Sequence, residues 1–226
     1  MQEGTKLWYL ENFNLFEGMK SSEMMKLGEM TSMRSITKRQ HIYFPDDPSK
    51  TIFFLKKGRV KLGSYTEDGK EMIKFILNPG EIFGELGLAG EEKRTDFAEA
   101  LDDDTMLCAV GVRDMEMMME MNPKLNLKVT KLIGFRLRKI ERRLESMFFK
   151  DVRTRIIDFL KELAEDKGRK LGQEIVVEHR LTHQDIANLT ATSRQTVTTI
   201  LNELKEKNLI HINRKSLIIR SIDKLK

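Results

Sequence analysis

The sequence predicts an α+β protein: an N-terminal antiparallel β-roll of the jelly-roll kind, one long helix and a C-terminal winged helix-turn-helix. Short strand-like runs at 36–112, an apolar heptad pattern after Pro123 and two capped helical segments within 182–207 indicate this order. The expected parts are a roll domain at 1–122, a long helix at 123–150 and a winged helix domain at 151–226.

The roll is predicted from β-branched and aromatic runs with turn residues between them. The runs are Ile42–Phe44, Ile52–Leu55, Val60–Tyr65 and Met72–Leu77. Strands at this spacing are typical of an antiparallel sandwich or roll. The Asp68-Gly69 step between the last two runs predicts a hairpin. Before the roll, residues 5–30 are expected to be helical.

An apolar seam predicts that the residues after Pro123 form one long helix. Its members recur at alternating spacings of four and three residues: Ile133, Leu137, Ile140, Leu144 and Met147. This is the a/d pattern of a coiled coil. The seam packs either on the chain's own core or on the same seam of a second copy. We expect the second arrangement, a parallel homodimer.

Two capped segments after residue 181 predict a helix-turn-helix. Thr182 followed by Asp185 resembles a capping box at the start of a first helix, and Ser193 is placed to cap a second. The second helix has an apolar stripe at helical spacing, formed by Val197, Ile200, Leu201 and Leu204. In a helix-turn-helix the second helix enters the major groove of DNA. The alternative is a plain helical hairpin with polar outer residues.

The exposed side of the second helix and the segment after it favour double-stranded DNA as the partner. Leu209–Ile212 and Leu217–Arg220 predict a β-hairpin wing with a basic tip. Cap residues and side chains suited to bases and phosphates form the predicted interface. Its members are Thr182, Ser193, Arg194, Gln195, Thr196, Thr198, Thr199, Arg214 and Lys215.

The distribution of charge agrees with a nucleic-acid partner. Residues 1–122 have a net charge of −6, residues 123–150 of +7 and residues 151–226 of +4. A basic second half indicates contact with a polyanion, although ordinary variation of surface charge gives the same pattern.

Several classes of protein are excluded. No apolar run approaches the ~20 residues that a membrane span requires, and the first ten residues lack the basic and apolar order of a secretory signal. The lone Cys108 fits the reducing cytoplasm and excludes an internal disulfide or a cysteine-built metal site. No paired His and carboxylate, Walker loop or nucleophile elbow indicates an enzyme.

A glycine-rich segment at 79–88 predicts a site for an anionic ligand. Glycines let the backbone approach a ligand, and a short helix from Glu85 directs N–H groups at an anion. Arg94 offers a fork for phosphate and Thr95 a hydroxyl donor, while Glu85 can accept from a sugar hydroxyl. In the alternative, Gly84 and Gly87 serve turns, and Arg94 pairs with Glu85 or Glu92.

These motifs resemble those of the cyclic-AMP receptor protein (CRP/FNR) family of bacterial transcription regulators, over nearly the whole chain. Residues 84–88 with Arg94 and Thr95 resemble the phosphate-binding cassette of that family. Residues 193–197 with 208–210 resemble its recognition helix and the chain that follows.

The resemblance implies a cyclic nucleotide, cAMP or cGMP, or a similar effector bound between the roll and the long helix. Glu85 would hold a ribose hydroxyl, Arg94 and Thr95 the cyclic phosphate, and Arg136 would lie over the ligand. The hydroxyl pair with which the family reads adenine aligns here with Ile140 and Glu141, and the loop before Arg94 is shorter, so the effector's identity stays open. The implied pocket residues are Gly84, Glu85, Leu86, Arg94, Thr95, Arg136 and Ile140.

The family's metal-dependent branches are not expected here. The iron–sulfur branch uses several cysteines, and the haem branch uses a Cys and a His near the cassette, where this chain has neither between Glu67 and Glu92. His41 and His183 are too far apart in the sequence to indicate a metal site. We therefore expect no metal, haem or iron–sulfur cluster.

Partners and rival functions follow from the same resemblance. It implies a palindromic operator and RNA polymerase as partners. Arg194 matches the family's base-contacting arginine, whereas Gln195 and Thr199 replace a common glutamate and arginine, which predicts an altered operator. One rival is a ligand-independent DNA-binding regulator with a vestigial or self-filled pocket. Another is a nucleotide-binding regulatory subunit that acts on proteins, against which the helix-turn-helix argues.

Overall fold

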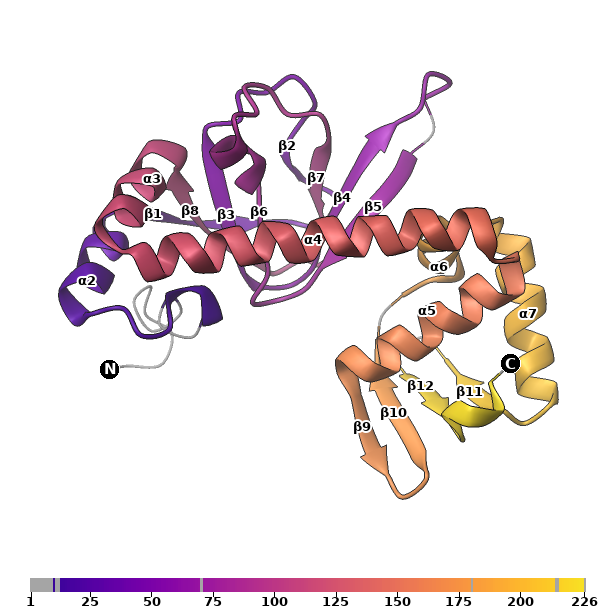
Figure 1. Cartoon of the computed structure of the whole chain (residues 1–226). Helices are drawn as coiled ribbons and strands as arrows, with labels where there is room; N and C mark the ends of the chain where they lie inside the picture. The colour runs from indigo at the N-terminus through magenta and orange to yellow at the C-terminus, as the bar shows by residue number, and fades with distance from the viewer. Residues whose placement is uncertain (1–9, 11–12, 70, 180, 214–215, 226) are drawn as a thin grey trace. The chain divides into compact units, whose positions relative to one another are not determined.

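The computed structural model describes residues 10, 13–69, 71–179, 181–213 and 216–225. It divides into two compact units, an N-terminal unit at Met1–Arg136 and a C-terminal unit at Leu137–Lys226. The division lies within helix α4 (Pro123–Phe149), so this helix contributes its first half to one unit and its second half to the other (Figure 1).

Two antiparallel sheets form the roll of the N-terminal unit (Figure 1). Their strand orders are β1-β8-β3-β6 and β2-β7-β4-β5. The strands are β1 (Thr31–Ile36), β2 (His41–Tyr43), β3 (Thr51–Lys57), β4 (Val60–Tyr65), β5 (Glu71–Leu77), β6 (Ile82–Phe83), β7 (Phe97–Ala100) and β8 (Thr105–Gly111). Leu55, Phe83 and Leu107 are fully or almost fully buried in the apolar cluster that joins the sheets.

The predicted roll is therefore confirmed, and so is the hairpin at Asp68-Gly69, since β4 and β5 pair antiparallel. At Gly69 the backbone adopts φ of +76°, and its N–H donates to the carbonyl oxygen of Thr66 at 2.9 Å. Glycine takes up this left-handed conformation without a steric penalty. The expected strands at 52–55, 60–65 and 72–77 lie within β3, β4 and β5.

Helices close one side of the roll with a second apolar cluster that includes Phe16, Leu27, Phe54, Met115 and Leu125. These elements are η1 (Asn14–Phe16), α2 (Ser21–Met30), η2 (Glu85–Ala89), α3 (Val112–Met121) and the first half of α4. Of the helix expected over 5–30, residues 5–9, 11 and 12 lie outside the described residues, and the described part is not one continuous helix. A single turn precedes Gly18, whose φ of +80° departs from helical geometry, and α2 begins only at Ser21.

The C-terminal unit is a winged helix-turn-helix, as predicted (Figure 1). Its sheet has the order β11-β12-β10-β9, and one apolar core joins the sheet to the helices, with Val177 and Leu217 from the strands and Leu160 and Leu201 from the helices fully buried. The elements are α5 (Val152–Lys167), β9 (Gly168–Leu171), β10 (Glu174–Glu178), α6 (His183–Leu189), α7 (Arg194–Glu206), β11 (Ile210–Ile212), β12 (Ser216–Ile219) and η3 (Ile222–Lys224). The β9–β10 hairpin was not predicted.

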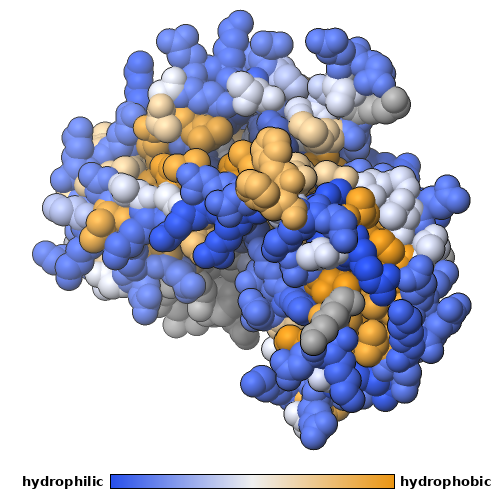
Figure 2. All heavy atoms as spheres, turned by 45° about the vertical axis from the view of Figure 1, so that its right-hand side comes forward, coloured by the Kyte–Doolittle hydropathy of each residue, from blue (hydrophilic) through white to orange (hydrophobic). Residues whose placement is uncertain are grey.

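Among the described residues, no helix is long and apolar enough to span a membrane. Apolar side chains nevertheless reach the surface in several patches on the face drawn in Figure 2. α4 also carries exposed apolar side chains, among them Leu137 and Leu144, and their positions bear on how the chain assembles.

Candidate nucleic-acid interface and effector site

The two helices of the helix-turn-helix, α6 and α7, begin at side-chain caps. Thr182 Oγ1 accepts a hydrogen bond from Asp185 N at 3.1 Å, and Asp185 Oδ2 accepts one from Thr182 N at 2.8 Å. Ser193 Oγ accepts from Thr196 N at 3.0 Å at the start of α7. Both caps satisfy backbone donors that a helix start leaves free. The sequence prediction of these two helix starts is confirmed.

A tight turn connects α6 and α7. The buried Thr190 donates from Oγ1 to Ile186 O at 2.7 Å, and Thr192 N donates to Ala187 O at 2.9 Å. Between them Ala191 has φ of +49°. A residue with a Cβ is strained in this left-handed region, so the turn stores some conformational energy.

The start of α7 presents a polar surface. Arg194, Gln195 and Thr199 are exposed, as expected for residues that contact DNA. Thr196 and Thr198 are half-buried and already engaged. Thr196 Oγ1 lies 2.8 Å from the hydroxyl of the Ser193 cap. The predicted wing residues Arg214 and Lys215 lie outside the described residues.

Thr198 is tied to the first helix by a histidine. Thr198 Oγ1 donates to Arg194 O at 2.9 Å and lies 2.8 Å from Nδ1 of His183. Because the threonine proton is used on the carbonyl, the imidazole is the donor in this pair. Burial, followed by the positive charges of Arg194 and Lys205, lowers the pKa of His183. This histidine therefore positions α7 on α6.

Two arginines cap the carbonyl end of α6. Arg143 of α4 donates to Leu189 O, and Arg155 of α5 donates to Thr190 O at 3.0 Å and to Ala191 O at 3.2 Å. A helix end leaves carbonyls without partners, and cations there also complement the helix dipole. Sequence reasoning treated Arg143 only as part of the basic charge, because its partner lies 46 residues away.

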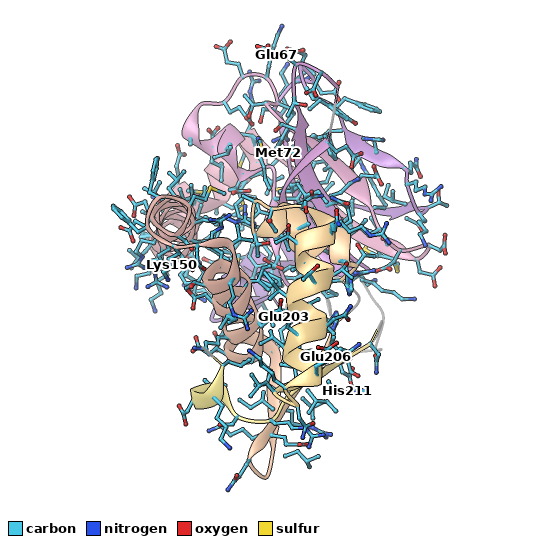
Figure 3. All side chains as sticks on the ribbon, turned by 90° about the vertical axis from the view of Figure 1, so that its right-hand side faces the viewer. Glu67, Met72, Lys150, Glu203, Glu206 and His211 are labelled. Carbon is cyan, nitrogen blue, oxygen red and sulfur yellow. The ribbon has the colours of Figure 1, made fainter. Side chains whose placement is uncertain are left out.

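An ion pair joins α5 to α7 on another side of the C-terminal unit. Arg153 Nη1 donates to Oε2 of Glu203 at 2.6 Å, and Figure 3 shows Glu203 on α7. Nearby in sequence, Lys150, which directly follows α4, pairs with Asp158 at 2.6 Å. Part of the positive charge of this unit is thus used internally.

The apolar seam of α4 is largely exposed. Leu137, Ile140, Leu144 and Met147 are each between 42 % and 56 % exposed, whereas Ile133 is half-buried and packs against the core of the N-terminal unit. Beyond the seam, Phe148 and Phe149 are more than 80 % exposed. We call the five predicted residues the α4 seam. Only its first member is covered by the chain itself to a substantial extent.

Two glycines of the cassette are required by close approaches. Gly84 has φ of +77°, and a Cβ there would lie 2.8 Å from Thr51 O and 3.0 Å from Nη2 of Arg94. A Cβ at Gly87 would lie 2.5 Å from Ser49 O. Real Cβ atoms do not come this close to backbone, so the glycines let the cassette fold around Arg94.

Arg94 is 3 % exposed and lies at the centre of this arrangement. Nη1 donates to Gly84 O at 3.1 Å, Nη2 donates to Thr51 O, and the guanidinium carbon lies 4.5 Å above the ring of Tyr43. Its buried Nε has no hydrogen-bond partner among the described residues. We call Tyr43, Thr51, Gly84 and Arg94, together with Glu91 beside them, the Arg94 cradle.

The carboxylate nearest to Arg94 is that of Glu91, not that of Glu85 or Glu92, the two partners that the sequence suggested. Glu91 Oε2 lies 3.6 Å from Arg94 Nη1, whereas Glu85 pairs with Arg136 and Glu92 is exposed. Sequence reasoning missed Glu91 because Glu91 and Glu92 are adjacent and equivalent by spacing. Only the turn that ends η2 distinguishes their directions.

Glu85 and Arg136 meet across 51 positions of sequence. Glu85 is 5 % exposed and accepts a hydrogen bond from Arg136 Nη1, while Nη2 donates to Ile82 O. The resemblance implied that both residues contact an effector; that they pair with each other, through a buried carboxylate and a half-buried guanidinium, was not predicted. Breaking such a pair leaves an uncompensated charge, unless a ligand supplies the missing contacts.

The other predicted pocket residues, Leu86, Thr95 and Ile140, are exposed. Leu86 is 44 % exposed, and Thr95 is exposed with its hydroxyl bonded to Glu91. Ile140 lies on the part of α4 that belongs to the C-terminal unit and is 42 % exposed. The N-terminal unit thus brings Gly84, Glu85, Arg94 and Arg136 together, while Leu86 points to solvent.

Tyr43, a member of the cradle, is hydrogen-bonded to the half-buried carboxyl of Asp96. Tyr43 donates to Asp96 Oδ1 at 3.2 Å, and burial raises the pKa of both groups. The negative charge of Asp96 raises the pKa of Tyr43 further, whereas Lys74 opposes the shift of Asp96. Tyr43 is 7 % exposed and lies against the guanidinium, so little water reaches this side of Arg94.

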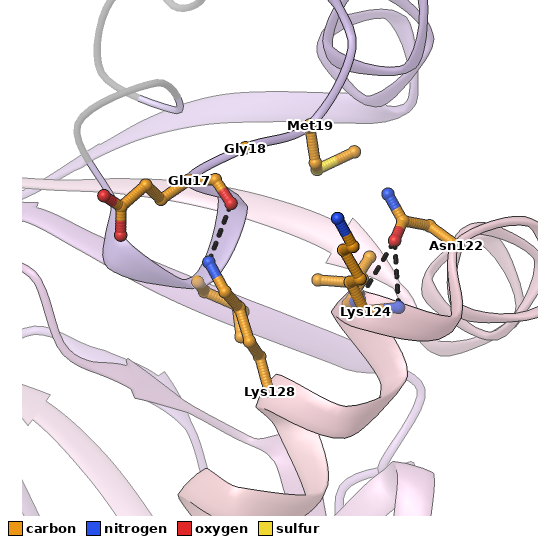
Figure 4. A pocket seen from close by; sticks show the side chains of 8 residues that line it. Glu17, Gly18, Met19, Asn122, Lys124 and Lys128 are labelled. Carbon is orange, nitrogen blue, oxygen red and sulfur yellow. Dashed lines mark hydrogen bonds between the residues drawn. The ribbon is translucent and has the colours of Figure 1, made fainter.

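A shallow pocket in the N-terminal unit is lined by side chains that already hydrogen-bond to the backbone around it. It lies where Glu17–Met19 approach the start of α4 (Figure 4). Lys128 Nζ donates to Glu17 O at 2.7 Å, and Asn122 Oδ1 accepts from the backbone of Lys124 and Leu125. These bonds hold the chain together and leave little for a ligand. The described residues contain no group of three His, Cys, Asp or Glu suited to a metal ion.

Comparisons with known proteins match both units. The family described as "Cyclic nucleotide-binding domain" matches residues 33–122, and the one described as "Crp-like helix-turn-helix domain" matches residues 154–226. The Global nitrogen regulator of Synechocystis sp. is 30 % identical over 201 residues, which cover 88 % of each chain. The CRP-like cAMP-activated global transcriptional regulator of Mycobacterium tuberculosis is 27 % identical over 96 % of each chain.

Solved structures of similar regulators have the same fold. A CooA mutant from Carboxydothermus hydrogenoformans has a TM-score of 0.79 at 26 % identity, and the match covers 100 % of this chain and 96 % of that one. FixK2 from Bradyrhizobium japonicum has a TM-score of 0.75 at 20 % identity over 86 % of this chain and 95 % of that one, a likeness of fold alone.

Proposed function

The chain belongs to the CRP/FNR family of transcription regulators, and from this premise we propose that it binds a palindromic operator as a homodimer under the control of a small anionic effector. The relatives that it matches are transcription regulators rather than enzymes. The proposal concerns the residues that read DNA, the seam that pairs two copies and the ligand of the Arg94 cradle.

DNA reading is assigned to the start of α7. The capped helix start turns Arg194, Gln195 and Thr199 outward, and this is the observation that carries the proposal. Arg194 fits guanine O6 and N7, and Gln195 fits adenine N6 and N7. Thr182, Ser193, Thr196, Thr198 and the wing residues Arg214 and Lys215 are proposed to contribute contacts to the DNA backbone.

The homodimer is proposed to form along the α4 seam. Four of its five members are at least 42 % exposed, and apolar side chains at a/d spacing bury themselves in a parallel coiled coil. A two-fold axis along α4 then presents two α7 helices to half-sites about 34 Å apart. This supports an operator with two-fold symmetry.

The effector is proposed to be a cyclic nucleotide, cAMP or cGMP, or a related small anion. Arg94 is a buried cation whose Nε lacks a partner among the described residues, and Glu85 lies on the same cassette. The Mycobacterium tuberculosis relative is named as cAMP-activated, while the Synechocystis relative is named for nitrogen regulation. Ligand-independent regulation is the second candidate, favoured by the ion pair between Glu85 and Arg136.

Each of the three predicted segments is proposed to have one role. Residues 1–122 are proposed to sense the effector, residues 123–150 to dimerise and residues 151–226 to bind DNA. RNA polymerase is proposed as the protein partner, as expected for a regulator of transcription, and the cytoplasm as the location.

Selection of operators from random DNA with the full-length protein tests the proposal. We expect a palindrome whose half-sites lie one helical turn apart, bound with a Kd of about 10⁻⁸–10⁻¹¹ M. Titration of that operator with cAMP and cGMP present or absent then tests effector control. An enriched site without two-fold symmetry contradicts the dimer, and affinity that neither nucleotide changes favours ligand-independent regulation.

A further inference from the structure

The carboxylate of Glu91 is held as a bound anion is held. Ser49 Oγ donates to Oε2 at 2.7 Å, and Thr95 Oγ1 donates to Oε1 at 3.2 Å. Arg94 Nη1 lies 3.6 Å from Oε2. Two hydroxyl donors and a guanidinium thus surround one carboxylate, and hydrogen bonds to an ionised acceptor are stronger than those between neutral groups.

The donors around Glu91 are built into the fold. Ser49 is 4 % exposed and Arg94 is 3 % exposed. Ser49 N donates to Glu92 O at 2.9 Å, and the close approach of Gly87 fixes the backbone of Ser49 from the other side. Glu91 N donates to Leu86 O at 3.0 Å. Two of the three donors, Ser49 and Arg94, are therefore buried in the fold with the carboxylate between them and the exposed Thr95, so this contact is not a chance surface pair.

The carboxylate satisfies the cradle only in part. Each of its oxygens takes one hydroxyl hydrogen bond, and its distance to Arg94 Nη1 exceeds that of a good hydrogen bond. The buried Arg94 Nε has no partner among the described residues. A buried donor without a partner raises the free energy of the folded state. A phosphate has more oxygens than a carboxylate, although in a cyclic nucleotide only its non-bridging oxygens are strong acceptors, and Nε offers it one further donor.

We propose that Glu91 is an internal anion that occupies the effector site, and that an effector with a phosphoryl group has to displace it. This inference rests on the proposed function and names the regulation of the same site. A tethered carboxylate competes at a high effective concentration, so it excludes weakly binding anions. A ligand that also supplies contacts beyond its phosphoryl group overcomes this competition. Displacement returns Glu91 to solvent beside the exposed Glu92.

Calorimetric titration of the full-length protein with inorganic phosphate, cAMP and cGMP tests the proposal. In E91Q the competing charge is absent, and we expect at least one of these probes to bind at least about tenfold more tightly than to wild type. E92Q removes the same charge from the neighbouring exposed position and is expected to bind as wild type does. E91A serves as a second variant, because it removes the amide that remains in E91Q. Circular dichroism and DNA affinity report that each variant is folded.

The outcomes separate this inference from the proposed function. If E91Q and E91A bind every probe no more tightly than E92Q, the internal anion is refuted, even where wild type binds a nucleotide through Arg94. If E91Q gains affinity, and R94A in the same background removes the gain, the internal anion is supported. The gain supports it even if no probe changes DNA affinity, a result that would count against effector control instead.

Discussion

The guanidinium of Arg143 donates two hydrogen bonds to a single carbonyl oxygen, that of Leu189, from Nε at 3.1 Å and from Nη2 at 2.7 Å. Arg143 lies on α4 and Leu189 is the last residue of α6. The helix that carries the α4 seam therefore caps the first helix of the DNA-reading motif.

Replacement of Arg143 by Ala is expected to destabilise the C-terminal unit by about 1.5–3 kcal/mol, because hydrogen bonds to charged groups have this magnitude. Urea unfolding followed by circular dichroism measures the change. Arg142 is exposed on the next position of the same helix, so R142A is the matched control. Equal stability of the two variants would mean that water replaces Arg143 on the α6 carbonyl without loss.

Replacement of Arg194 by Ala is expected to weaken binding to the selected operator by about 1–3 kcal/mol and to relax the preference for guanine at one position of each half-site. Fluorescence anisotropy with the operator and with single-base variants measures both effects. K205A removes a positive charge from the last turn of α7 and is the control. A loss that is the same for all DNA sequences would assign Arg194 to phosphate contact instead.

Replacement of Leu144 by Glu is expected to convert the dimer into monomers, since a charge at an a-type position has to be buried in the interface. Sedimentation equilibrium reads this directly. Phe135 is 61 % exposed and lies on the opposite side of α4 from the seam, so F135E adds the same charge away from it. Dissociation by F135E but not by L144E would place the interface on the other face of the helix.

Replacement of Ala191 by Gly is expected to stabilise the C-terminal unit by about 1 kcal/mol, because glycine adopts positive φ without a Cβ clash. For a unit of this size the thermal midpoint is expected to rise by about 4–8 °C in differential scanning calorimetry. Ala187 lies within α6 and is fully buried, so A187G is expected to lower the midpoint. If A191G also lowers it, contacts of the Ala191 methyl outweigh the strain.

The lowered pKa of His183 predicts a pH dependence of stability. Because the pKa is below its unfolded value of 6.5, the unfolded chain takes up the proton first as pH falls. The contribution to stability is complete above pH 6.5 and is lost as pH falls from 6.5 to the folded pKa. Urea unfolding of wild type and H183Q between pH 5 and 8 measures it. We expect the slope attributed to this residue to disappear in H183Q, and identical slopes would contradict the assignment.

Local signals account for most of what the sequence predicted well. The cap residues Thr182 and Ser193 bond to groups three residues away, so both helix starts are predicted from a short stretch of sequence. The strands up to β5 are bounded by turn residues. By contrast, β9 was missed because the exposed residues Arg169 and Lys170 do not form an alternating apolar pattern, and the β-branched run at 175–177 in β10 was not interpreted as a strand.

Site residues that depend on distant partners were harder to predict. The family resemblance, rather than spacing, brought Glu85 and Arg136 together, and the structure has them paired. Nothing in the sequence distinguishes Glu91 from Glu92, because the backbone after Gly90 determines which carboxylate turns toward Ser49. The cap of Leu189 by Arg143 likewise depends on how three helices pack.

The lack of room for one carbon atom at Gly84 has a use in surveys of genomes. A Cβ there would lie 2.8 Å from the Thr51 carbonyl oxygen, and 3.0 and 3.1 Å from the terminal nitrogens of Arg94. Because the carbonyl belongs to the backbone and φ at Gly84 is positive, a homologue with another residue at this position is expected to fold the cassette around its arginine differently. The amino acid at this position therefore predicts, from sequence alone, which related regulators are able to hold the guanidinium inside the cassette as this chain does.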